Sequence, residues 1–144
     1  MTVRPATRED IDAMMSIRNN VRENALVNTV IDADDYVRAM TVEGKAWVYE
    51  DDGEVLGFSC GRTRQGDIWA LFVREAHESR GIGSALMDAV EAWMFAQGVA
   101  EIWLVTSPGT RAERLYQHRG WTKVRDEPTG EARYTLRPPE HDRP

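Results

Sequence analysis

Hydrophobic positions change their spacing along the chain, and the changes mark successive helices and strands. Residues 2–4 are typical of a short strand. Apolar residues then recur every three or four positions over residues 11–21, which predicts an amphipathic helix. Thr7 and Asp10 resemble a capping box at its start, with Asp in place of the usual Glu. Residues 34–40 predict a second, shorter helix.

Strand patterns replace the helical spacing in the middle of the chain. Three apolar runs at residues 46–49, 55–61 and 68–73 are separated by the turn sequences Asp-Asp-Gly-Glu and Gln-Gly-Asp. Short strands joined by such turns predict a three-stranded meander. The third run is almost wholly apolar, so we expect it to be a central strand buried on both faces.

The rest of the chain alternates helices with strands. A long amphipathic helix is expected from Ile82 to the terminating Gly98. A strand at residues 102–105, parallel to its predecessor, a helix at 111–119 and strands at 121–124 and 133–136 follow. The order β-α-α-β-β-β-α-β-α-β-β predicts an α+β fold, with a mixed, mostly antiparallel sheet flanked by helices. We expect a single domain over residues 1–137 and a flexible tail at 138–144.

The composition excludes some classes of partner and indicates where in the cell the protein is found. Eighteen Lys and Arg stand against 24 Asp and Glu, so the net charge of −6 argues against a nucleic-acid partner. No apolar run approaches the roughly 20 residues of a membrane helix, and the amino terminus has no apolar signal segment. The single cysteine, Cys60, and three separated histidines predict neither an internal disulfide nor a metal site. We therefore expect a cytoplasmic protein with no membrane partner.

The loop Glu-Ser-Arg-Gly-Ile-Gly-Ser at residues 78–84 is the strongest candidate for chemistry. It lies between an apolar strand and a long helix, and Gly81 and Gly83 allow a ligand close to the backbone. N–H groups at a helix start attract anions, and Arg80 adds a full charge, so a phosphate site is one interpretation of this loop. On these residues alone, a glycine pair at a helix start is more often only a turn. Leu86 stands where a dinucleotide-binding fingerprint needs a third small residue, and no Gly-Lys-Ser/Thr triplet occurs.

With a second motif, this loop resembles the GCN5-related N-acetyltransferases (GNAT). The family's loop is Arg or Gln, two residues, Gly, any residue, then Gly or Ala, which corresponds here to Glu78, Gly81 and Gly83. Residues 111–121 are similar to its second motif, a helix that carries Leu-Tyr and ends at Gly and an aromatic residue. The resemblance covers nearly all of residues 2–136. It implies the acyl-CoA N-acyltransferase fold and acetyl-CoA as cosubstrate.

The resemblance also implies a cofactor site. Two positions depart from the family pattern: Glu78 replaces Arg or Gln, and Gly109 stands where many members carry Asn, a role that Ser107 or Thr110 would have to fill. The strand at residues 68–73 would offer backbone groups to the pantetheine arm of the cosubstrate, and the loop at residues 78–84 would bind its pyrophosphate. The implied cofactor-binding residues are Leu71, Phe72, Val73, Glu78, Ser79, Arg80, Gly81, Ile82, Gly83, Ser84, Gly109 and Arg111.

In this family a primary amine of a small molecule or peptide attacks the thioester directly. The resemblance makes Tyr116 the candidate catalytic proton donor to the leaving thiolate, with packing of helix against sheet as its other interpretation. His77, His118, Glu23, Glu101 or a water chain would supply the base. Residues 19–28 and 126–133 would contact the acceptor, or would equally form an ordinary solvated surface. The candidate substrate-binding residues there are Arg22, Glu23 and Asn24, with Glu127 and Glu131 in the second segment.

Two other functions fit the same sequence. A non-catalytic acyl-CoA-binding or regulatory module would keep the fold and lack turnover, which the departures at Glu78 and Gly109 allow. A nucleotide-binding module would use the loop for a different phosphate ligand. A homodimer is the candidate assembly, and the identity of the amine acceptor is not specified by any residue pattern.

Overall fold

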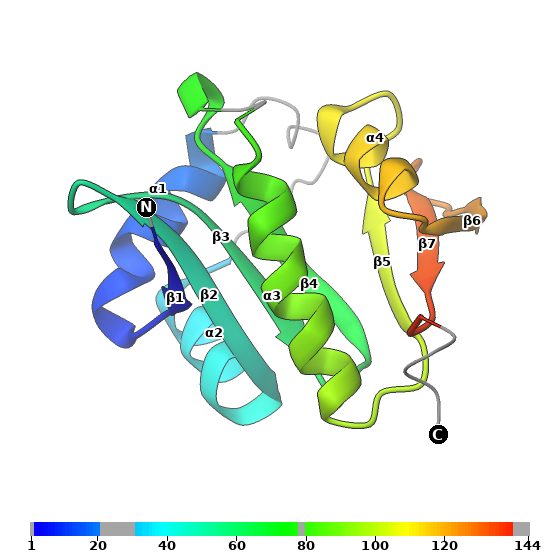
Figure 1. Cartoon of the computed structure of the whole chain (residues 1–144), viewed down its shortest axis with the longest axis horizontal. Coiled ribbons are helices and arrows are strands. Elements are labelled where there is room, and N and C mark those ends of the chain that lie inside the picture. The colour runs from blue at the N-terminus through cyan, green and yellow to red at the C-terminus, as the bar shows by residue number, and fades with distance from the viewer. Residues whose placement is uncertain (1, 21–30, 78–79, 140–144) are drawn as a thin grey trace.

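The computed structural model describes residues 2–20, 31–77 and 80–139, and within them the predicted order of elements is confirmed (Figure 1). The strands are β1 (Thr2–Pro5), β2 (Gly44–Asp51), β3 (Glu54–Arg62), β4 (Asp67–Val73), β5 (Ile102–Thr106), β6 (Thr122–Asp126) and β7 (Ala132–Leu136). The helices are α1 (Ile11–Asn20), α2 (Ala33–Arg38), α3 (Ile82–Ala96) and α4 (Arg111–His118). Shorter helical turns are η1 (Arg8–Asp10), η3 (Ala39–Glu43) and η4 (Glu75–His77).

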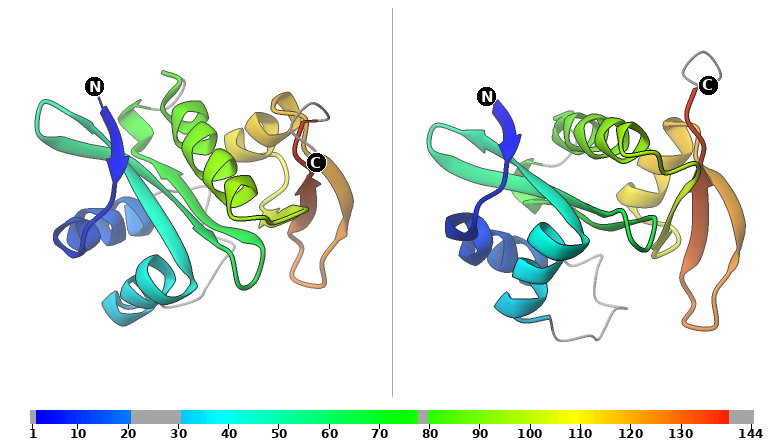
Figure 2. Two further views of the ribbon diagram at one scale, coloured as in Figure 1. Left: turned by 60° about the horizontal axis from the view of Figure 1, so that its bottom comes forward. Right: turned by 90° about the horizontal axis from the view of Figure 1, so that it is seen from below.

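The strands of the described residues form one mixed sheet in the order β1-β2-β3-β4-β5-β7-β6. Among these described strands, only the β4–β5 pair is parallel, as predicted. Helices cover both faces: α3 lies on one side and α1 and α2 on the other (Figure 2). The buried residues accordingly form two clusters, one around Leu86 and Val90 of α3 and one around Met14 and Ile17 of α1. Among the described residues, no helix has the length and hydropathy needed to span a bilayer.

Small residues of β3 let α3 pack close to the sheet. A Cβ atom on Gly57 would lie 3.1 Å from Cδ1 of Leu86, and one on Gly61 would lie 2.8 Å from Sδ of Met94. Between them, the Ser59 hydroxyl donates a hydrogen bond of 3.1 Å to the Leu86 carbonyl. Larger side chains at these positions would push α3 outward, so β3 fixes the height of α3 above the sheet.

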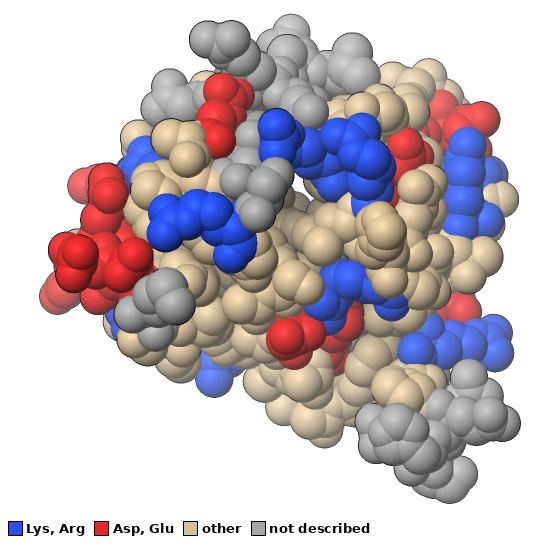
Figure 3. All heavy atoms as spheres, turned by 45° about the horizontal axis from the view of Figure 1, so that its top comes forward, with Lys and Arg blue, Asp and Glu red and all other residues tan. Residues whose placement is uncertain are grey.

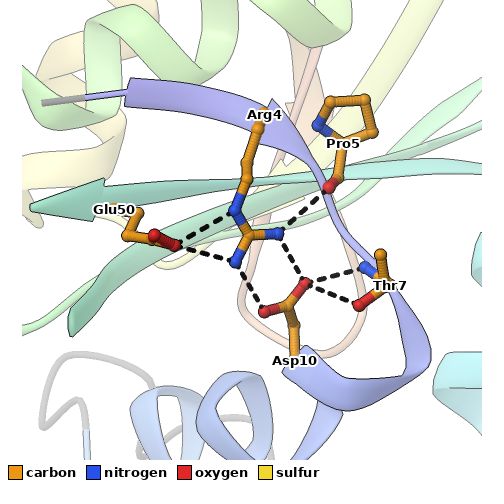
Figure 4. A network of polar contacts seen from close by, with 5 residues as sticks. All are labelled: Arg4, Pro5, Thr7, Asp10 and Glu50. Atoms are coloured by element: carbon orange, nitrogen blue, oxygen red, sulfur yellow. Dashed lines mark hydrogen bonds and ion pairs between the residues drawn. The ribbon is translucent and has the colours of Figure 1, made fainter. Parts of the chain in front are cut away.

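Arg4 links β1 to η1 and to β2 through hydrogen bonds (Figure 4). Its guanidinium donates two bonds of 2.9 Å to the Asp10 carboxylate and bonds of 3.0 and 3.1 Å to Glu50 of β2. Asp10 also accepts a bond of 2.7 Å from the Thr7 N–H, which confirms the contact predicted from their spacing. The hydrogen bonds from Arg4 hold the pKa of Asp10 below its ordinary range.

Strands β4 and β5 part soon after they begin. Asp67 and Trp103 are the paired positions recorded between them in the described sheet, and the ribbons diverge from there (Figure 1). The Trp103 N–H donates to the Gly66 carbonyl at 3.1 Å, and its indole N–H donates to the Gln65 carbonyl at 3.0 Å. Arg62 donates to both oxygens of the Asp67 carboxylate. The start of the divergence is therefore held by backbone and side-chain bonds.

The parting of the strands corrects one prediction. Ile68 and Ala70 are buried, but Leu71, Phe72 and Val73 are only half-buried. The expected strand buried on both faces is thus wrong for the second half of β4. Because no strand pairs with that edge in the described structure, its backbone and side chains border a cavity instead.

Candidate functional site

A cavity of about 460 Å³ lies where β4 and β5 part. Its walls come from β4, the end of β5, the start of α3 and the face of α4. Concave sites of a few hundred cubic ångströms are the usual size for small-molecule ligands. The predicted site residues that line it are Leu71, Phe72, Val73, Gly81, Ile82, Gly83, Ser84, Arg111 and Tyr116.

The other predicted site residues fall into two groups. Arg80 and Gly109 are described but do not line the cavity. Glu78, Ser79, Arg22, Glu23 and Asn24 lie outside the described residues. The lining also includes residues that the motifs did not indicate, among them Trp69 of β4, the end of β5 and Arg114. Arg114 follows Arg111 by one helical turn, so helical spacing was a signal for it.

The cavity borders both layers of the protein. Leu71 and Val73 pack with the core on the α3 side of the sheet. Trp69 and Phe72 pack with the core on the α1 side, yet all four residues line the cavity. Ligand groups can therefore meet β4 from either face of the sheet.

The first turn of α3 is suited to an anion. Gly81 is the N-cap residue, with φ of 81°, and no described side chain makes a capping hydrogen bond there. N–H groups at an uncapped helix start carry partial positive charge and need acceptors. A Cβ atom on Gly83 would lie 3.1 Å from Cδ2 of Leu115, so this turn of α3 packs closely on α4.

Basic residues add to the positive charge at the start of α3. Arg111 and Arg114 line the cavity from α4, and Figure 3 shows Lys and Arg side chains bordering a hollow at this end of the molecule. Arg80 has its Nη1 2.6 Å from Nδ1 of His77. A guanidinium only donates, so Nδ1 accepts and the neutral ring carries its proton on Nε2. The chain is acidic overall, but this rim is basic.

Tyr116 reaches the cavity from α4. Its side chain is 5% exposed and its ring centroid lies 5.9 Å from that of Trp121. Burial, together with the negative charge of Glu91, raises the pKa of the hydroxyl. No hydrogen bond joins this hydroxyl to another described residue. Tyr116 therefore keeps its proton and has it available for a ligand atom.

The turn before α4 explains how Gly109 is used. Its φ is 78°, and its N–H donates a bond of 2.8 Å to the Glu113 carboxylate. Thr110 caps α4 by accepting from the Glu113 N–H at 3.2 Å, and its hydroxyl donates to the Ser107 carbonyl at 2.8 Å. Ser107 and Thr110 line the cavity, whereas Gly109 holds the turn to the helix.

The candidate bases fall into two groups. His77 and His118 line the cavity, as does Glu131 from the segment expected to contact the acceptor. Glu101 is not in the lining and pairs with Arg137 at 2.8 Å instead. Glu23 lies outside the described residues. Within the described ranges, no group of His, Cys, Asp and Glu is arranged to hold a metal ion.

Comparison with solved structures identifies the same fold. A PaiA N-acetyltransferase from Thermoplasma acidophilum, in complex with coenzyme A, is 14% identical with a TM-score of 0.79, and the match covers 95% of this chain and 99% of that one. The ribosomal-protein-S18-alanine N-acetyltransferase from Escherichia coli is 15% identical with a TM-score of 0.76, over 94% of this chain and 92% of that one.

Sequence comparison gives the family. A mycothiol acetyltransferase of Beutenbergia cavernae is 32% identical over an 84-position alignment that covers 54% of this chain. The match spans only 28% of that longer protein. The model of the acetyltransferase (GNAT) family matches residues 12–121, which include both motifs and most of the sheet. The chain therefore belongs to the acetyltransferase (GNAT) family.

Proposed function

We propose that the protein is an acetyl-CoA-dependent N-acetyltransferase that moves an acetyl group to a primary amine of a small molecule or peptide. The observation that carries this proposal is the parting of β4 from β5 beyond Asp67, directly beside the start of α3, where no described side chain makes a capping hydrogen bond. An extended thiol-bearing arm fits along an unpaired strand edge, and a pyrophosphate fits at a helix start.

The residues present suit the cosubstrate. The N–H groups of the first turn of α3, from Ile82 to Ser84, would bind the pyrophosphate, with Arg111 and Arg114 nearby. Leu71, Phe72 and Val73 would offer backbone groups to the arm, because alternate residues of a strand direct their N–H and C=O groups away from the paired neighbour. One such N–H would stabilise the negative charge that develops on the acetyl oxygen.

The reaction needs a proton acceptor for the amine. An alkyl amine has a pKa of about 10.4, so only about one molecule in a few thousand is neutral at pH 7. Groups that line the cavity and can accept the proton, directly or through water, are His118 and Glu131, whereas Nδ1 of His77 already accepts a bond from Arg80. The amine would then attack the thioester carbonyl and release the thiol.

Tyr116 would act on the leaving sulfur. A thiol has a pKa of about 8.5, lower than that of the buried tyrosine, so complete transfer of the phenol proton to sulfur would be unfavourable. The Tyr116 hydroxyl would instead donate a hydrogen bond that stabilises the developing thiolate. The final proton on sulfur would come from the amine or from water.

The test combines binding and turnover. Calorimetry should detect coenzyme A binding to the folded protein, and an amine panel with acetyl-CoA should release free thiol with a gain of one acetyl group on the acceptor. Binding without release for every amine would favour the non-catalytic acyl-CoA module. Thermal protection by ATP or NAD, but not by coenzyme A, would favour a nucleotide-binding module and contradict the proposal.

A further inference from the structure

Arg18 of α1 stands out among the arginines of the described residues. Its guanidinium carbon lies 5.3 Å from the ring centroid of Phe72 and 5.9 Å from that of Trp69. No carboxylate of a described residue pairs with it, whereas Arg4, Arg62 and Arg119 all pair with carboxylates. Among the described residues, the charge of this partly buried arginine is therefore not neutralised by a carboxylate, and a guanidinium stacked on aromatic rings is suited to bind an oxyanion.

Tyr36 of α2 places a second polar group on the same rings. Its ring packs edge-on against Trp69 at 5.2 Å, and the residue is 1% exposed. In the described part of the chain, its hydroxyl is the one buried side-chain polar atom without a hydrogen-bond partner. Burial raises the pKa of this hydroxyl, and both the charge of Arg18 and the approach of its guanidinium to the hydroxyl oxygen oppose the rise. Such unsatisfied donors are rare in folded proteins.

The two rings connect these donors to the cavity. Trp69 and Phe72 line it, and both pack with the core on the α1 side of the sheet. The start of α3, where the cosubstrate's phosphates would lie, packs on the opposite side. Arg18 and Tyr36 do not line the cavity themselves, but Arg18 contacts two rings that do, on the side of the sheet opposite the cosubstrate's phosphate site.

We infer that the Arg18 guanidinium, with the Tyr36 hydroxyl beside it, forms a subsite for an oxyanion of the acceptor, a carboxylate or a phosphate ester. The inference rests on the proposed function, because it describes which amines that function would use. A guanidinium stacked on a ring keeps its N–H groups in the ring-parallel plane, where they can bind two oxygens of one oxyanion. Preferred acceptors then carry a primary amine and a negative group on one molecule.

Packing of Arg18 on Phe72 and Trp69 is the competing explanation. Cation–π contacts would help to hold α1 against β4 whatever the acceptor is. That role predicts a loss of stability in Arg18 variants, equal for every substrate. The subsite predicts a loss that depends on the charge of the acceptor, so paired acceptors separate the two explanations.

The experiment compares β-alanine with β-alaninamide, and 2-aminoethyl phosphate with ethanolamine. In the Arg18→Met variant, kcat/KM should fall about 10- to 100-fold for the acceptors with an oxyanion, as expected on losing charge-assisted hydrogen bonds, and less than about threefold for their neutral partners. Arg18→Lys should restore part of the difference. Arg8→Met, the same change at an exposed arginine of η1, should alter neither class. The two charged acceptors show whether carboxylate or phosphate is preferred.

Tyr36→Phe gives an independent measurement. Removal of an unsatisfied buried hydroxyl should leave the melting temperature unchanged or raise it. If the hydroxyl binds the oxyanion, kcat/KM should still fall about three- to tenfold for the charged acceptors only. Unchanged kinetics for all four acceptors would exclude Tyr36 from the subsite.

The outcomes also separate this inference from the proposed function. Equal losses for charged and neutral acceptors in Arg18→Met overturn the subsite and leave the acetyltransferase proposal intact. If no amine is turned over, binding decides whether the subsite exists. Calorimetry then measures the affinity of the wild type and Arg18→Met for N-acetyl-β-alanine and for 2-aminoethyl phosphate, with and without coenzyme A. Weaker binding in Arg18→Met supports the subsite, and equal or absent binding overturns it. Absent coenzyme A binding overturns the proposed function.

Discussion

Asp67 of β4 lies opposite Trp103 of β5 at the point where the two strands part. Arg62 holds the Asp67 carboxylate, with a shortest distance of 2.6 Å, and the guanidinium carbon of Arg133 lies 4.0 Å from a ring centroid of Trp103. Each side of the divergence is thus anchored by an arginine from a neighbouring strand. The gap beyond it keeps its shape because its narrow end is fixed.

Asp67→Asn should loosen this end. The change removes the closer of the two carboxylates that pair with Arg62, at a site where the Asp67 side chain is only 6% exposed. We expect the free energy of unfolding to fall by about 2–4 kcal/mol, since one partner of a buried ion pair is lost. Urea unfolding measures this, and coenzyme A affinity should fall with it. Asp126→Asn, at an exposed ion pair with Lys123, should cost less than about 1 kcal/mol. Equal effects of the two variants would contradict the anchoring role.

Gly81 should matter for ligand binding in a way that Gly98 does not. Both have positive φ, 81° and 90°, with open space where a Cβ would be, at opposite ends of α3. Alanine at either site should cost about 1–2 kcal/mol of stability through backbone strain. Only Gly81→Ala should weaken coenzyme A binding, as calorimetry would show. Gly81→Asp should abolish binding through charge repulsion, while Gly98→Asp should retain it.

Gly83→Asp tests the same site by crowding. A side chain there must displace Leu115, because its Cβ alone would lie 3.1 Å from Cδ2. We expect loss of coenzyme A binding together with a lower melting temperature. Gly83→Ala needs only a small shift of Leu115 and adds no charge, so it should retain weakened binding. Unaltered affinity in Gly83→Asp would move the phosphate site away from this turn.

Tyr116→Phe should separate binding from turnover. The hydroxyl has no hydrogen bond to another described residue, so its removal should leave the fold and coenzyme A affinity unchanged. We expect kcat to fall about 10- to 100-fold as a donor to the leaving sulfur is lost. Steady-state kinetics with a turned-over amine measure this. Tyr49→Phe, outside the cavity lining, serves as the control, and equal kcat in Tyr116→Phe would remove Tyr116 from the mechanism.

Cys60 should not interfere with assays that detect free thiol. The side chain is fully buried, and burial raises the pKa of its thiol to about 12. Because the thiolate is the reactive form, the native protein should not react with dithiodipyridine on the assay timescale. The denatured protein should react with one equivalent, since the chain has a single cysteine. Rapid reaction of the native protein would contradict the burial of Cys60 in the α1-side core.

Acid should weaken the attachment of β1 through Asp10. The pKa of Asp10 is lowered in the folded protein by its bonds to Arg4, so the carboxylate stabilises the fold above the unfolded pKa of about 4. That contribution is lost as pH falls from about 4 through the lower folded pKa. Melting curves should therefore show a large difference between the wild type and Asp10→Asn at pH 7, which shrinks below pH 4. A difference independent of pH would contradict this role.

Local pattern predicted the order of elements and the glycine turn at α3, because caps, turns and apolar spacing are properties of short segments. The half-burial of Phe72 depends on a strand far along the chain turning away, which no local pattern encodes. Helical spacing likewise placed Arg18 on α1 but did not bring it to the rings of Trp69 and Phe72. That contact arises only when α1 packs across the sheet against β4.

The cavity borders both layers of the protein, since Leu71 and Val73 belong to one core and Trp69 and Phe72 to the other. A ligand bound on the α3 side of the sheet can therefore dissociate without passing a ligand bound on the α1 side. Two reactants can consequently be bound at the same time. Double-reciprocal plots of the initial rate against the concentration of one reactant, measured at several fixed concentrations of the other, should then intersect rather than run parallel.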